Sequence, residues 1–203
     1  MFSIFTYHTE NRNRVAKYLR SVAEDCRDRG HYGAACDYLE KFLSIVDDPD
    51  EKAECLLSMG QILEGAQAYE VALEKYLSAF GLPQKSNEVW YFLNNNAAYC
   101  LNKTERYQEA EKHCRVAIRI DPDRHNAHKN LGIALQNQGR FVDAAMHYVH
   151  ATKLAPTDTR THALLEDLIA SHREILEEVP GLLEQFHDCC EAEQAGKEKI
   201  RPQ

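Results

Sequence analysis

The sequence lacks long hydrophobic runs. None of its apolar stretches approaches the roughly 20 residues that a membrane-spanning helix requires. Its first residues, Met1 to His8, contain hydrophobic side chains but no continuous apolar stretch of the kind found in a signal peptide. We therefore expect a cytoplasmic protein that does not insert into membranes.

The motifs of common catalytic and cofactor sites are also missing. The chain has no Gly-rich phosphate loop, no nucleophile elbow and no H-E-x-x-H sequence. Its 7 cysteines form no C-x-x-C pair, and their odd number and scattered positions do not suggest a disulfide framework. The sequence thus predicts free thiols, no bound cofactor and no enzymatic activity.

Basic residues are too few to favour a nucleic-acid partner. Lys and Arg number 24 against 32 Asp and Glu, which gives a formal net charge of −8. A field of this sign repels a phosphate backbone. With 44% hydrophobic and 28% charged residues in 203 positions, the composition is that of one globular domain with a sizeable core.

The 10 histidines are the main argument for a metal site. The pairs His125 with His128 and His147 with His150 have a helical i,i+3 spacing, but no third ligand is evident near either pair. The run from His187 to Cys190 lacks the two-residue spacer of zinc knuckles. We predict no metal site. A metal-binding protein or an enzyme that uses these side chains remains the alternative from another functional class, and elemental analysis would detect its bound metal.

A repeat organises the chain between Tyr91 and Asp158. Its two halves match at an offset of 34 residues. The matching pairs are Asn96 with Asn130, Leu101 with Leu135, Tyr107 with Phe141, Ala110 with Ala144, Ala117 with Ala151, and Pro122 with Pro156. A fixed period of this length is typical of repeat architectures, and the apolar residues within each half have helical spacing. Each half is therefore predicted to be a helical hairpin.

This pattern resembles the tetratricopeptide repeat (TPR). The second half carries its key residues in register: Leu131, Gly132, Leu135, Gly139, Ala144, Tyr148, Ala151 and Pro156. The first half departs from the family pattern at Asn94 and Cys114, where large or aromatic residues are usual. The resemblance implies an all-α fold, a right-handed superhelical stack of TPR-like helical hairpins with capping helices at its C-terminal end.

The same register extends over weaker sequence before Tyr91, so we expect four repeats. They cover residues 16–49, 53–86, 91–124 and 125–158, after an N-terminal lead-in at 1–15. Thr157 or Asp158 is placed to cap a helix whose apolar stripe covers the last hairpin; the stripe comprises Leu164, Leu165, Leu168, Ile169, Ile175 and Leu176. Capping helices are thus expected at 159–190 and a disordered tail at 191–203.

The resemblance further implies that the first helix of each repeat lines a concave groove. The residues expected to contact a peptide there are Asn95, Asn96, Tyr99, Asn102, Asn126, Lys129, Asn130, Ile133 and Asn137. Asparagine side chains both donate and accept hydrogen bonds, so they suit the backbone of an extended peptide. In similar proteins the sixth-position asparagine, here Asn96 or Asn130, has this role, although the residue also serves the fold.

The sequence does not support binding of a chaperone's acidic C-terminus. The corresponding clamp positions hold Leu57, Gln61, Asn96, Asn126 and Asn130, and of these only Asn96 matches the clamp pattern. We therefore predict a noncatalytic scaffold or adaptor that binds a peptide segment of a partner protein in its groove. A cytoplasmic secretion-type chaperone with the same fold is an alternative, and the sequence leaves homo-oligomerisation open.

Overall fold

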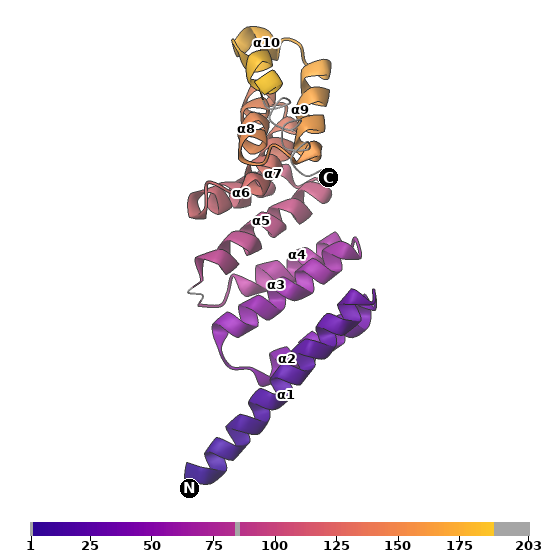
Figure 1. Ribbon diagram of the computed structural model, residues 1–203, viewed down its shortest axis with the longest axis vertical. Coiled ribbons are helices and arrows are strands. Elements are labelled where there is room, and N and C mark those ends of the chain that lie inside the picture. The colour runs from indigo at the N-terminus through magenta and orange to yellow at the C-terminus, as the bar shows by residue number, and fades with distance from the viewer. Residues whose placement is uncertain (1, 84–85, 189–203) are drawn as a thin grey trace, which may run out of the picture. The chain divides into compact units, whose positions relative to one another are not determined.

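The computed structural model describes residues 2–83 and 86–188, with side chains from Glu10 onward (Figure 1). Within these ranges the regular structure is α-helical and contains no strand, which confirms the expected all-α fold. The helices are α1 Phe2–Asp28, α2 Tyr32–Ile45, α3 Pro49–Gly65, α4 Tyr69–Ala79, α5 Asn87–Lys103, α6 Tyr107–Ile120, α7 His125–Gln136, α8 Phe141–Leu154, α9 Thr159–Ser171 and α10 Ile175–Glu178. Residues 182–188 are also helical.

The chain divides into two compact units where the composition suggested one domain. The boundary lies between Cys100 and Leu101, inside α5. Residues 2–15 also differ from expectation, because they belong to the long helix α1 and not to a separate lead-in. Arg12 connects this part of α1 to the end of α2: its side chain pairs with Asp47 at 2.7 Å, just beyond α2, and donates a hydrogen bond to the carbonyl oxygen of Ile45, the last residue of α2. The expected tail at 191–203 lies outside the described residues.

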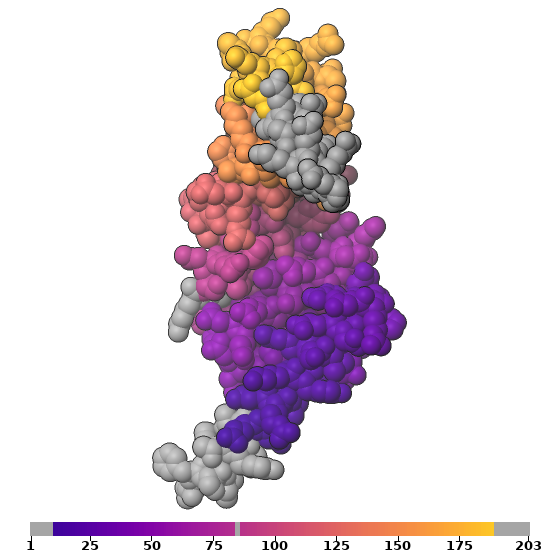
Figure 2. Space-filling model, in the orientation of Figure 1, coloured from indigo at the N-terminus to yellow at the C-terminus, as the bar shows by residue number. Residues whose placement is uncertain are grey.

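In the first unit, α1 packs on α2, α2 on α3, and α3 on α4. One core cluster joins the first three of these helices and includes Leu19, Leu39, Phe42 and Met59. The sequence fixes the start of α3 through Asp48, whose carboxylate accepts hydrogen bonds from the Asp50 and Glu51 amides at 2.9 and 3.0 Å. Side chains of α1 and α2 form the indigo surface in Figure 2. Tyr18 of α1 is 64% exposed.

The turn between the two helices of each predicted repeat has the same backbone conformation. The residue at position 15 of the repeat has a positive φ in all of them: Gly30 (76°), Gln67 (60°), Glu105 (60°) and Gly139 (77°). This left-handed conformation is favourable for glycine and costs about 1–2 kcal/mol for other residues. The register read from the sequence therefore corresponds to a recurring structural position, even where the glycine is absent.

Two glycines allow tyrosine rings to enter the hairpin interior. A Cβ atom on Gly60 would lie 2.2 Å from Tyr76 Cε1, and one on Gly132 would lie 2.4 Å from Tyr148 Cε1. Both rings are fully buried. Such distances are far below the carbon–carbon contact distance of about 3.5–4.0 Å. The glycine therefore makes space that the tyrosine fills.

In the second unit, α6 packs on α7, α7 on α8, and α8 on α9. Asp158 caps α9, as the sequence suggested, by accepting a hydrogen bond from the Arg160 amide. The single helix expected after Asp158 is instead divided: α9 ends at Ser171, and α10 begins at Ile175 and contacts α8. Leu165, Leu168 and Ile175 are nevertheless almost fully buried. The residues of the apolar stripe therefore still cover α8, but they are divided between α9 and α10.

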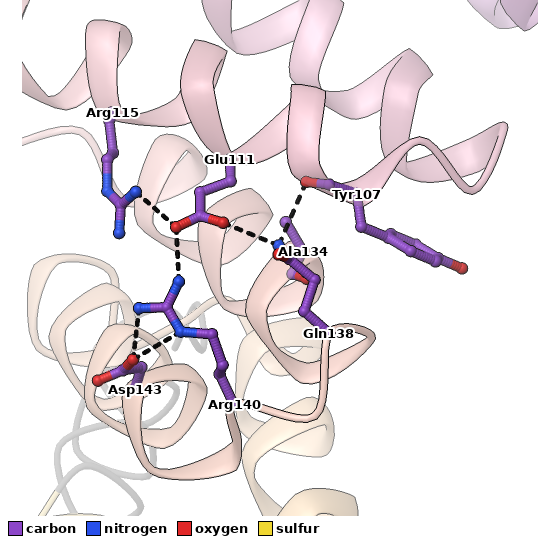
Figure 3. A network of polar contacts seen from close by, with 7 residues as sticks. All are labelled: Tyr107, Glu111, Arg115, Ala134, Gln138, Arg140 and Asp143. Carbon is purple, nitrogen blue, oxygen red and sulfur yellow. Dashed lines mark hydrogen bonds and ion pairs between the residues drawn. The ribbon is translucent and has the colours of Figure 1, made fainter.

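A polar network joins α6, α7 and α8 (Figure 3). Glu111, which is 7% exposed, accepts hydrogen bonds from Arg140 at 2.7 Å and from Gln138 at 2.9 Å, and pairs with Arg115 at 2.5 Å. Arg140 also binds Asp143 at 2.6 Å. Burial alone would raise the pKa of Glu111, but the hydrogen bonds and the two guanidinium groups outweigh it and lower this pKa.

Replacing Glu111 with glutamine should weaken the second unit at neutral pH and reduce its acid sensitivity. Because the folded-state pKa is lowered, the carboxylate stabilises the fold above its unfolded pKa of about 4.3, and this contribution is lost as the pH falls through the folded value. We expect Glu111→Gln to cost about 1–3 kcal/mol at pH 7 and less below pH 4. Urea unfolding at both pH values tests this, with exposed Glu177→Gln as the control; an equal loss at both pH values would contradict it.

Candidate functional site

In the first unit, the predicted contact residues lie on α5. Asn95 is 8% exposed and donates a hydrogen bond to Asn96 Oδ1 at 3.0 Å, while Asn96 and Tyr99 are half-buried. The Tyr99 ring meets the Tyr69 ring edge to face, with centroids 5.9 Å apart. Burial and a hydrogen bond with Tyr69 raise the pKa of Tyr99 to about 12, so its hydroxyl is neutral. Of these predicted contact residues, only the Asn96 amide and the Tyr99 ring are partly accessible to solvent.

Glu64, near the end of α3, belongs to the same region. Its Oε1 atom accepts hydrogen bonds from the Tyr76 hydroxyl at 2.6 Å and from the Cys100 thiol at 3.7 Å. Tyr76 in turn interacts with the Asn96 side chain. Burial raises the pKa of Glu64, and the two hydrogen bonds offset only part of that rise. Our sequence reasoning missed Glu64, although it occupies position 12 of its repeat, which faces the groove in the family register.

In the second unit, the predicted contact residues of α7 and its neighbours differ in accessibility. Asn126 and Asn137 are exposed and Ile133 is half-buried, whereas Asn130 is only 4% exposed. Asn102 Nδ2 donates to the Asn130 carbonyl oxygen at 2.8 Å, and Asn137 Nδ2 donates to the Ile133 carbonyl oxygen at 2.9 Å. The burial of Asn130 favours a role for its side chain in the fold. Asn126, Ile133 and Asn137 are the more accessible to a ligand.

Lys129 is engaged within the protein. Its ammonium group lies 2.9 Å from Asp158 Oδ2, and both side chains are about 15% exposed. The Thr161 hydroxyl donates to the same carboxylate oxygen at 2.7 Å. Burial would raise the pKa of Asp158, but the hydrogen bonds and the charge of Lys129 lower it. Lys129 therefore ties α7 to the start of α9.

The fold brings together histidines from both pairs identified in the sequence. His128 Nδ1 lies 3.2 Å from His147 Nδ1, and the His128 and His150 ring centroids are 4.2 Å apart. Burial and the neighbouring histidines lower the pKa of His147 to about 4. In the described part of the chain, however, no group of three or more His, Cys, Asp or Glu side chains is arranged to hold a metal ion. Cys189 and Cys190 of the other cluster lie outside the described residues.

None of the described helices has the length and hydropathy of a membrane span. In the part of the chain that the structure describes, Cys26, Cys36, Cys55, Cys100 and Cys114 form no disulfide bond with one another. Burial raises the pKa of Cys55 to about 12, so this thiol remains protonated at neutral pH.

Comparison with protein families identifies the repeat. Residues 93–124 match the family model described as tetratricopeptide repeat. Over 77 residues, 37% of this chain, the sequence is 34% identical to protein O-mannosyl-transferase Tmtc2 of Drosophila melanogaster, and the match covers 8% of that protein. It is 29% identical over 137 residues to small glutamine-rich tetratricopeptide repeat-containing protein 2 of Saccharomyces cerevisiae, covering 66% of this chain and 38% of the yeast protein. The chain thus spans far less than two thirds of these relatives.

Solved structures show the same fold over most of the chain. MamA from Desulfovibrio magneticus RS-1 aligns with a TM-score of 0.71 and 21% identity, covering 89% of this chain and 96% of that one. PilF of Pseudomonas aeruginosa aligns with a TM-score of 0.67 and 20% identity, covering 90% and 78%. The family match and this likeness of fold agree with the hairpins described above. The chain therefore carries a tetratricopeptide repeat at residues 93–124, and it shares its overall fold with these structures.

Proposed function

We propose that this protein is a noncatalytic, cytoplasmic adaptor that holds an extended peptide segment of a partner protein on the first helices of its repeats. The observation that carries the proposal is the accessible mixture of amide, aromatic and aliphatic groups on these helices. In the first unit these are Asn96 and Tyr99, and in the second unit Asn126, Ile133 and Asn137. Amide groups bind a peptide backbone whatever its side chains are, and the apolar groups add burial.

The net charge supports a protein partner over nucleic acid. At −8 the molecule repels phosphate backbones and attracts basic segments. Lys129, the cation predicted to face the groove, is already neutralised by Asp158. The proposed partner segment is therefore not recognised through an acidic group at this position.

Substitutions on opposite sides of one hairpin test the proposal. A peptide selected from a random library on the wild-type protein is titrated against Ile133→Arg, on α7, and Met146→Arg, on α8. We expect Ile133→Arg to weaken binding about tenfold or more, because a central contact residue is replaced by a bulky charge. Met146 is 45% exposed and serves as the matched control, whose substitution should leave the affinity unchanged. The reverse pattern would place the binding surface on the second helices.

A further inference from the structure

Glu64 is a half-buried carboxylate that has no cation as a partner among the described residues. Its recorded contacts are the Tyr76 hydroxyl and the Cys100 thiol, and both reach the same oxygen, Oε1. Burial raises the pKa of this group, which measures how unfavourable the position is for a negative charge. A half-buried, unpaired carboxylate costs stability, so it needs an explanation beyond packing.

Gln136 shows that the fold requires only a neutral acceptor at this position. It occupies position 12 of the last repeat, as Glu64 does in the second. The Tyr148 hydroxyl donates to Gln136 Oε1 at 2.7 Å, and the Tyr76 hydroxyl donates to Glu64 Oε1 at 2.6 Å. A glutamine thus performs the same structural task without an ionised group. The negative charge of Glu64 is additional to what the hairpin needs.

The surroundings of Glu64 suit a positively charged group. Tyr69 and Tyr99 meet edge to face nearby, and the charge of Glu64 contributes to the raised pKa of Tyr99. Asn96 interacts with Tyr76, the residue that holds the carboxylate. Aromatic rings attract cations through their faces, and a carboxylate forms short charge-assisted hydrogen bonds with ammonium or guanidinium groups. All of these residues belong to the first unit.

We propose that Glu64, together with Tyr69 and Tyr99, binds a lysine or arginine side chain of the partner peptide. This inference rests on the proposed function and specifies the chemistry of its ligand. An incoming cation removes the cost of the unpaired carboxylate, so part of the binding energy comes from relief of that cost. The overall charge of −8 adds a long-range attraction for a basic segment.

The test begins with a random peptide library of about twelve residues displayed on phage and selected on the full wild-type chain. We expect the selected peptides to share a lysine or arginine at one position. Glu64→Gln should lower the affinity of such a peptide about ten- to a hundredfold, and so should replacement of that basic residue by norleucine. The two changes together should lose little more than either alone, because they remove the same contact.

Glu64→Gln is a conservative probe because it copies the natural arrangement at Gln136. Thermal melting of the variant should match wild type or rise. Glu177→Gln, which removes an exposed carboxylate from α10, outside the first helices of the repeats, should not change the affinity. As a measurement that needs no variant, an NMR titration of the Glu64 carboxyl should show its pKa falling when the peptide is bound.

The outcomes separate this inference from the proposed function. Selected peptides without a shared basic residue, or equal binding by wild type and Glu64→Gln, would overturn the role of Glu64 and leave the adaptor function standing. A pKa of Glu64 that stays unchanged on binding would also overturn that role. The proposed function itself would be overturned if peptide binding survived Ile133→Arg and was lost on substitution of residues on the second helices.

Discussion

Gly60→Ala is expected to destabilise the first unit by about 1–3 kcal/mol. Alanine is normally the better helix residue by about 0.8–1.0 kcal/mol. Here, however, its Cβ would lie 2.2 Å from Tyr76 Cε1, and the ring is fully buried with its hydroxyl bound to Glu64. Overpacking of this kind costs about 1–3 kcal/mol or more, so the clash outweighs the gain in helix propensity. Urea unfolding monitored by circular dichroism measures the change.

Two further variants make this prediction specific. Gly65 lies on the same helix, and a Cβ added there would have nothing within 4 Å. Gly65→Ala should therefore be neutral or stabilising. In the first hairpin the positions of Gly60 and Tyr76 are taken by Ala23 and Leu39, so Gly60→Ala combined with Tyr76→Leu should lose less than the sum of the single changes. Greater stability of Gly60→Ala alone would contradict the packing described.

Leu168→Ala should be among the most damaging single changes in the second unit. Leu168 is fully buried in α9, which covers α8 at the end of the repeats. Truncation of a buried leucine to alanine costs about 2–5 kcal/mol, because apolar contact is lost and a cavity remains. That is a large share of a typical total stability of about 5–15 kcal/mol. The loss should appear in thermal and urea unfolding, together with a greater tendency to aggregate.

Leu183→Ala is the matched control for the capping role of α9. Leu183 follows α10 and is 44% exposed, so its truncation should change the free energy of unfolding by no more than about 0.5 kcal/mol. If Leu168→Ala were equally mild, α9 would not be an essential cover for α8. A capping helix predicts a clear difference between the two leucines.

The repeat register was the most predictable part of the fold, because it follows from residue size and helical spacing. Gly132 and Tyr148, which the register placed on facing helices of one hairpin, lie against each other, and position 15 of the repeat, occupied by Gly139 in the last hairpin, has a positive φ at Gln67 and Glu105 as well. It did not predict the break after Ser171. Ile175 has the same spacing from Leu168 whether the helix continues or turns back, so periodicity alone cannot distinguish the two.

The candidate site was only partly predictable, because register gives the direction of a side chain but not its partners. Asp158 was one of two predicted helix caps, with Thr157, yet its pairing with Lys129 joins residues 29 positions apart and depends on how α9 packs. The burial of Asn95 and Asn130 likewise depends on neighbouring helices. Glu64 could have been found by extending the groove positions to the second repeat.

NMR chemical-shift mapping with the library-selected peptide tests the central proposal most directly. An adaptor that binds peptides on its first helices should show its largest changes at Asn96 and Tyr99 in the first unit and at Asn126 and Ile133 in the second. Changes concentrated instead on exposed side chains of the second helices, such as Val71, Leu77 and Met146, would contradict the proposal and assign recognition to the opposite face.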